Sequence, residues 1–205
     1  MALSTFVYLR NVNNLSDARY AAGMGVDLIG FKLSPLNSES LNPEQFKEIA
    51  AWISGVKIVG EFDDMHAEAV AGQLKHYELD YLLIHDVSQL HAFAQLGISL
   101  ILNVPMDGQS EDQLRSTINY ASGTVDYFLL ESAQTIFEAE DLASIKAIAH
   151  SYPVILGTGI TGHNATSIVE DLGLEGISLQ GASEIRPGYK EFDEIATILE
   201  LLEVD

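Results

Sequence analysis

Eight short runs rich in Val, Ile, Leu and Tyr recur along the chain, and stretches with helical periodicity separate them. The expected strands are Phe6–Leu9, Leu28–Phe31, Lys57–Glu61, Tyr81–His85, Leu100–Asn103, Tyr127–Leu130, Val154–Leu156 and Gly176–Leu179. Nearly uniform apolarity is typical of strands buried on both faces, and strict alternation with short links indicates parallel strands. The pattern predicts an α/β protein, a single-domain (β/α)8 TIM barrel over residues 1–205, with a doubly wound open sheet ranked second.

Capping residues predict where several helices start and end. The expected starts are Ser16 before Asp17, Pro43 after Asn42, and Ser110 before Glu111. Small polar residues at these places accept hydrogen bonds from the first free N–H groups of a helix. Helix ends are expected at Gly23 or Gly25, Gly55, Gly97, Gly123 and Gly173, because glycine adopts the left-handed conformation that closes many helices.

The charge balance excludes several classes of partner. The chain has 30 Asp and Glu against 10 Lys and Arg, a formal net charge of −20. We expect no nucleic-acid partner, because phosphate backbones require basic patches. No apolar run approaches the roughly 20 residues that cross a bilayer, and the first residues lack the features of a signal peptide, so we expect no membrane partner. The absence of cysteine excludes a disulfide framework and fits a cytoplasmic location.

Polar side chains stand at the ends of all eight expected strands. They are Arg10, Lys32, Glu61, His85, Asn103, Glu131, Thr158 and Gln180. In a (β/α)8 barrel the functional groups lie at the carboxyl ends of the strands, although a strand end that merely reaches water explains any single one of these. Glu131, Glu61 and His85 are candidates for acid/base catalysis, because these groups titrate near neutrality or can be tuned to do so. Arg10 and Lys32 are candidates for binding an anionic group.

Small residues follow the last two strands, as Gly157-Thr158-Gly159 and Gly181-Ala182-Ser183. Such residues let backbone N–H groups approach an anion, and a helix N-terminus adds positive potential. The loops after strands seven and eight are the usual phosphate site of this fold. We therefore expect a phosphorylated small-molecule ligand at Gly157, Thr158, Gly159, Gly181, Ala182 and Ser183. The six histidines show no metal-ligand spacing, so no metal site is expected.

Several segments match the motifs of one family in order and spacing. They are Asp17-Ala18, Gly25-Val26-Asp27-Leu28-Ile29-Gly30-Phe31, Val59-Gly60-Glu61-Phe62, His85, Leu156-Gly157-Thr158-Gly159-Ile160 with Asn164, and Glu184 with Pro187-Gly188-Tyr189-Lys190-Glu191. On these residues the chain resembles phosphoribosylanthranilate isomerase, a single-domain (β/α)8 barrel of tryptophan biosynthesis. The resemblance runs over nearly the whole length. It implies a cofactor-free Amadori rearrangement of an N-(5-phosphoribosyl) amine to a 1-amino-ketose.

The resemblance also implies where this chain departs from the family. The family uses a Cys general base after strand one and an Asp general acid after strand six. Here the K-I-C-G motif reads Tyr8-Leu9-Arg10-Asn11, and the acid position holds Glu131. Arginine stays protonated at any usable pH and cannot abstract a proton. The S-P-R segment, whose arginine would meet the anthranilate carboxylate, reads Ser38-Glu39-Ser40.

Side-chain alternation adds a prediction about the barrel interior. If Arg10 points inward, so do Tyr8 and Phe6, and if Glu131 does, so do Leu129 and Tyr127. The plain role of the two tyrosines is to fill the core, and their bulk reduces the space left for a substrate.

Three hypotheses about function follow. In the first, a divergent family member binds a phosphorylated small molecule of the sugar phosphate type, with Arg10 as an anion clamp and Glu131, Glu61 and His85 available for proton transfer. In the second, the chain is a functional phosphoribosylanthranilate isomerase whose base is Glu131 or His85. In the third, it is a non-catalytic binding protein that kept the barrel. The sequence leaves the substrate and the oligomeric state open.

Overall fold

A computed structural model describes residues 2–35, 37, 39–63, 65–181, 184–186, 189–190 and 193–204. Eight parallel strands hydrogen-bond in sequence order, and the last pairs with the first to close a barrel. They are β2 (Phe6–Val12), β3 (Leu28–Lys32), β4 (Lys57–Glu61), β5 (Tyr81–Ile84), β6 (Ser99–Pro105), β7 (Tyr127–Glu131), β8 (Val154–Leu156) and β9 (Gly176–Gln180). The predicted single-domain (β/α)8 barrel is confirmed, and the open doubly wound sheet is wrong.

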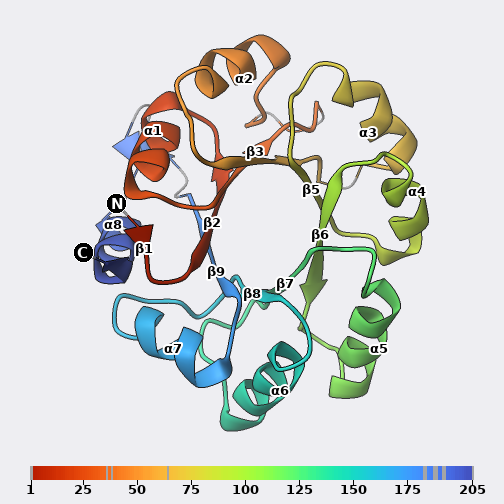
Figure 1. The fold of residues 1–205 in the computed structure, drawn as a ribbon, viewed down its shortest axis with the longest axis vertical. Coiled ribbons are helices and arrows are strands. Elements are labelled where there is room, and N and C mark those ends of the chain that lie inside the picture. The colour runs from red at the N-terminus through yellow and green to blue at the C-terminus, as the bar shows by residue number, and fades with distance from the viewer. Residues whose placement is uncertain are drawn as a thin grey trace.

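Helices surround the barrel as a ring, one after each strand (Figure 1). Within the described ranges they are α1 (Leu15–Met24), α2 (Pro43–Ala50), α3 (Ala67–Leu74), α4 (Leu90–Ala94), α5 (Glu111–Ala121), α6 (Ala139–Ala149), α7 (Ala165–Leu172) and α8 (Asp193–Leu202), with a short 3₁₀ turn, η1 (Val87–Gln89), leading into α4. Among these described helices, none is both long and apolar enough to cross a bilayer.

Most predicted boundaries hold, and the misses have local causes. Asn42 and Ser110 cap α2 and α5 as expected, and Gly25 and Gly173 end α1 and α7 with φ of 80° and 66°. The ends predicted at Gly55, Gly97 and Gly123 are wrong, because α2, α4 and α5 are closed earlier by Ala51, Gln95 and Ser122. The start at Ser16 is wrong, because the Asn14 side chain accepts the hydrogen bond from the Asp17 N–H (2.9 Å) and the helix begins at Leu15. The strand β5 ends at Ile84, so His85 lies just beyond it.

Apolar side chains form two separate cores, one between the barrel and its helices and one inside the barrel. The interior cluster consists of Tyr8, Leu28, Val59, Tyr81, Leu83, Ile101, Leu129 and Ile155, with Phe6 and Tyr127 packed against it. The Phe6 and Tyr127 rings lie 5.0 Å apart, centroid to centroid. Tyr8 is fully buried. The inward orientation predicted from alternation is confirmed, and the interior is a packed core.

Two short antiparallel pairs lie outside the barrel. One pair joins β10 (Glu184–Arg186) to β11 (Tyr189–Lys190). The other joins the two ends of the chain, β1 (Ala2–Leu3) and β12 (Glu203–Val204), and the Ser4 N–H donates to the Leu202 carbonyl (2.7 Å). The strands β1 and β12 therefore lie side by side, next to α8 (Figure 1).

Candidate functional site

The centre of the site is Arg10, which projects from β2 into the mouth of the barrel, between carboxylates from two other strands. Its Nη1 donates to Oε1 of Glu131 at the end of β7 (2.5 Å). Its Nε lies 3.6 Å from Oε1 of Glu61 at the end of β4. Three of the predicted strand-end residues are thus brought into one cluster by strands that are far apart in sequence.

Glu61 is the most buried member of this cluster, with 1% of its surface exposed. The Tyr8 hydroxyl donates to its Oε1 (2.7 Å), which holds the carboxylate in place from below. Gly30 on β3 makes this arrangement possible, since a Cβ there would lie 1.9 Å from Glu61 Oε1 and 2.8 Å from the Tyr8 hydroxyl. Tyr8 is therefore more than core filling, because its hydroxyl orients a charged group.

Glu131 is held at both of its oxygens. Oε1 accepts from Arg10, and Oε2 accepts from the Nδ2 of Asn103 on β6. Gly157, directly after β8, leaves room for this side chain, since a Cβ there would lie 2.9 Å from Glu131 Cγ. Because both of its oxygens accept hydrogen bonds from side chains of the protein, Glu131 is placed as an acceptor in this arrangement.

The electrostatics of the cluster fix the charge of Arg10. Burial alone lowers the pKa of a guanidinium, but the charges of Glu61 and Glu131 outweigh that effect and raise the pKa of Arg10 above its usual value. Burial and the Glu61 charge likewise raise the pKa of Tyr8 well above its usual value, so its hydroxyl keeps its proton. One cation therefore faces two carboxylates, and it cannot act as a base.

The remaining strand-end candidates lie at the rim of the mouth. His85 reaches the surface, but neighbouring atoms remove part of its hydration, and this loss together with the Arg10 charge lowers the pKa of the imidazole. His85 is therefore mostly neutral at pH 7 and available as a proton acceptor. Lys32 turns toward the loop after β3, where its Nζ lies 4.0 Å from Glu39 Oε2.

Asn11 is a site feature that the sequence did not single out. The β2–β3 register shifts between Leu9 and Val12, and Asn11 sits in this bulge with a φ of 58°, a left-handed conformation that Asn adopts more easily than most residues. It is 8% exposed, and its Oδ1 is buried without a hydrogen-bond partner. Only the departure from alternation after Arg10 signals it in the sequence.

The turn after β8 has a specific structure. Gly159 has a φ of 77°, and a Cβ there would lie 2.7 Å from the Phe137 ring, so only glycine fits. Asn164 holds the turn, because its Nδ2 donates to the Gly159 carbonyl and its Oδ1 accepts from the Thr161 N–H, both at 2.8 Å. Thr158 exchanges hydrogen bonds with the backbone of Ser132 through its hydroxyl (3.1 Å each).

Backbone hydrogen bonds narrow the predicted anion site. The Gly157 N–H donates to the Leu130 carbonyl (2.8 Å), and the Gly181 N–H donates to the Arg10 carbonyl (2.9 Å). No described residue accepts a hydrogen bond from the N–H of Thr158 or Gly159. Among the described residues of the predicted anion site, the N–H groups of Thr158 and Gly159 are therefore the ones left free to bind a ligand. Ala182 and Ser183 lie outside the described residues.

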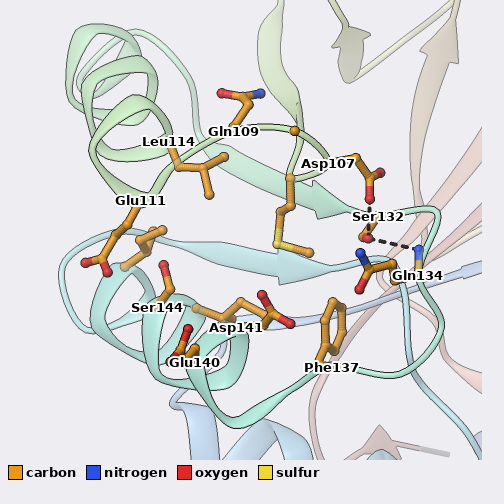
Figure 2. A pocket seen from close by; sticks show the side chains of 14 residues that line it. Asp107, Gln109, Glu111, Leu114, Ser132, Gln134, Phe137, Glu140, Asp141 and Ser144 are labelled. Carbon is orange, nitrogen blue, oxygen red and sulfur yellow. Dashed lines mark hydrogen bonds between the residues drawn. The ribbon is translucent and has the colours of Figure 1, made fainter.

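A concavity of about 340 Å³ lies between α5 and α6 (Figure 2). Asp107 at its edge accepts from the Ser132 hydroxyl and the Ala133 N–H (2.7 Å each), and these bonds lower the pKa of Asp107. They join the loop after β6 to the loop after β7. Ser132 also exchanges hydrogen bonds with Thr158. The edge of this groove is therefore connected to the turn after β8. Over the described part of the chain, no three or more His, Cys, Asp or Glu side chains converge as for a metal ion.

Comparison with known proteins decides which family this barrel represents. The family model described as N-(5'-phosphoribosyl)anthranilate (PRA) isomerase matches residues 9–201, a span that contains Arg10, Glu61, His85, Glu131 and the turn after β8. The chain belongs to the PRA isomerase family. The resemblance read from the sequence motifs is confirmed at the level of the family.

Individual PRA isomerases are distant relatives with matching length. A curated relative of that name from Parabacteroides distasonis is 25% identical, over 89% of this chain and 86% of its own. One from Maridesulfovibrio salexigens is 22% identical, over 95% and 96%. The solved structure of the enzyme from Thermococcus kodakaraensis has a TM-score of 0.78 at 17% identity, covering 98% of this chain and all of that one. Another PRA isomerase structure, in complex with reduced 1-(o-carboxyphenylamino)-1-deoxyribulose 5-phosphate, has a TM-score of 0.77 at 21% identity, with coverage of 96% and 97%.

Proposed function

We propose that this member of the PRA isomerase family binds a phosphorylated small molecule of the sugar phosphate type at the mouth of the barrel. The phosphate would take the N–H groups of Thr158 and Gly159, and the rest of the ligand would reach toward Glu131 and His85. Three features support this: the family, the turn after β8 with its hydrogen bonds to Asn164, and a related PRA isomerase whose structure contains a 5-phosphate compound.

We further propose that the reaction, if the ligand is turned over, is a cofactor-free proton transfer other than efficient PRA isomerisation. The observation that carries this is the ion pair between Arg10 and Glu131. By motif resemblance Arg10 takes the place of the general base and Glu131 that of the general acid. A guanidinium cannot accept a proton, and both oxygens of Glu131 are already engaged as hydrogen-bond acceptors within the protein. His85, lowered in pKa, is the group best able to move a proton.

PRA isomerisation itself is the second candidate, and the names of the curated relatives favour it. It requires His85 or Glu131 to replace the missing cysteine base. Mispositioning of a catalytic group by about 1 Å can cost roughly 100-fold in rate, so a rewired site predicts slow turnover.

The deciding experiment measures PRA turnover by the purified protein, beside a cysteine-containing family member under the same conditions. A tryptophan-requiring strain without its isomerase gives the matching growth test. We expect no rescue with the folded protein present, and turnover at least 100-fold below the comparison enzyme. Comparable turnover or full rescue would refute the proposed reaction other than PRA isomerisation and establish the second candidate.

The position of the phosphate is tested separately with Gly159→Asp. A carboxylate there repels an anion and blocks the turn, so binding of inorganic phosphate and ribose 5-phosphate should be lost. Gly123→Asp is the matched control, because Gly123 also has positive φ (83°) but open space around it and lies after α5. Equal phosphate affinity in both variants, with both proteins folded, would move the anion site elsewhere.

A further inference from the structure

Among the side chains that the structure describes at the mouth of the barrel, carboxylates outnumber cations. The charged side chains described there are two cations, Arg10 and Lys32, and four carboxylates, Glu39, Glu61, Asp63 and Glu131. Asp63 follows β4 and accepts from the Nδ2 of Asn37 (3.2 Å), and its charge acts on His85. Because the pKa of His85 is lowered, this imidazole adds little positive charge at pH 7.

Both described cations already face carboxylates. Arg10 is shared between Glu61 and Glu131, and its side chain is 12% exposed. Lys32 Nζ lies 4.0 Å from Glu39 Oε2, and Ser40 stands where the family motif has an arginine. A ligand carboxylate that binds Arg10 would have to displace Glu61 or Glu131, and one that approaches Lys32 would lie close to Glu39.

We infer that the ligand end opposite the phosphate carries hydroxyl or amino groups and no carboxylate, so an anthranilate-like group is disfavoured. This inference rests on the proposed function, since it concerns the second half of the same ligand. Glu131, whose side chain is 27% exposed, is the accessible acceptor for a ligand hydroxyl or ammonium group. The charged side chains around the mouth determine which group the ligand carries at this end, and the turn after β8 binds the phosphate at the other end.

Three sugar phosphates of similar size test this by calorimetry: glucosamine 6-phosphate, glucose 6-phosphate and 6-phosphogluconate. They share the phosphate and differ in an amine, a hydroxyl or a carboxylate. We expect 6-phosphogluconate to bind about tenfold more weakly than glucose 6-phosphate, and glucosamine 6-phosphate at least as tightly as glucose 6-phosphate. The differences should shrink in concentrated sodium chloride, which screens charge but not shape.

Glu39→Gln gives the sharper test, because it releases Lys32 without touching the buried cluster. The variant should bind 6-phosphogluconate about threefold more tightly and glucose 6-phosphate unchanged. Glu111→Gln is the control, since Glu111 also pairs with a cation, Arg115 (2.8 Å), but on the helix α5.

The outcomes separate the two levels of the proposal. If the wild-type protein binds none of the three compounds, the proposed phosphate site fails and the inference fails with it. If 6-phosphogluconate binds as tightly as glucose 6-phosphate or tighter, the inference alone is refuted. The inference alone is also refuted if Glu39→Gln and Glu111→Gln change the affinity for 6-phosphogluconate equally.

Discussion

Gly30 shows how much a single residue can decide in this barrel. It has no side chain, and this leaves the space in which Glu61 and the Tyr8 hydroxyl meet. That pair in turn faces the guanidinium of Arg10, which binds Glu131. The order of the whole charged cluster therefore depends on a missing Cβ on a neighbouring strand.

Gly30→Ala tests this dependence. The new Cβ would lie 1.9 Å from a buried carboxylate oxygen, so we expect a loss of about 2–3 kcal/mol in the free energy of unfolding, measured by urea denaturation. Gly72→Ala is the control, because Gly72 lies in α3 with open space around it, and alanine should stabilise that helix by about 1 kcal/mol. Equal effects at the two positions would contradict the account of Gly30.

His85 gives a prediction about pH. Its pKa is lowered in the folded protein, so below about pH 6.5 the unfolded chain binds a proton at this position more readily than the folded chain does. The contribution of His85 to stability is therefore full above that pH and is lost as the pH falls. The stability advantage of the wild type over His85→Asn should shrink between pH 7 and pH 5. NMR titration of the imidazole in the folded protein checks the cause directly, and a midpoint at or above about 6.5 would contradict it.

The charged cluster was only partly predictable from the sequence. The positions of the expected strand ends were enough to place Arg10, Glu61 and Glu131 at one end of the barrel, and side-chain alternation was enough to orient Tyr8 inward. Neither argument could show which strand-end residues would contact one another. The contact of Arg10 with two carboxylates depends on which strands face each other across the barrel. The bulge at Asn11 was missed for a similar reason, since it is set by pairing with β3.

At the scale of elements, three aspartates repeat one device at the amino ends of the strands. The N–H of each aspartate donates to the carbonyl of one residue on the preceding strand. The aspartate carboxylate accepts a hydrogen bond from the N–H of that strand residue. The pairs are Asp27 with Val7, Asp80 with Ile58, and Asp126 with Leu100, at carboxylate distances of 2.8, 2.7 and 3.2 Å. These double contacts join strand starts that would otherwise lack partners.

Asp27→Ala should cost about 1–2 kcal/mol in the free energy of unfolding, because the Val7 N–H loses its acceptor. Asp27→Asn keeps a side-chain oxygen and should retain most of that stability. Asp171→Ala, on the exposed side of α7, should change stability by less than about 0.5 kcal/mol. Guanidinium denaturation of the three variants measures the differences, and a neutral Asp27→Ala would show that water replaces the carboxylate.

Strand and helix types were predictable because burial on both strand faces leaves a clear apolar pattern. Strand boundaries were less predictable. The strand β2 continues to Val12, beyond the apolar run Phe6–Leu9, and β6 continues to Pro105, beyond the run Leu100–Asn103. The short pair of β1 with β12 has no such pattern, because it depends on the two ends of the chain meeting in space.

At the scale of the whole molecule, the net charge of −20 opposes compaction. We expect the melting temperature to rise as sodium chloride increases from about 0.05 M to about 0.5 M, because salt screens repulsion among exposed carboxylates. Sucrose at equal osmolality separates this effect from general solvent exclusion. A melting temperature that is unchanged or lower in salt would show that local ion pairs outweigh the global repulsion.

The pairing of Ala2–Leu3 with Glu203–Val204 has a topological consequence. A closed barrel of eight similar units has no fixed first unit. Here the first and last described strands, β1 and β12, are already joined by backbone hydrogen bonds. A circular permutant, with a short linker across this junction and new termini opened at Gly108 in the loop after β6, can therefore preserve every neighbour relation between barrel strands. The order in which the units are synthesised is then free to vary while the architecture stays the same.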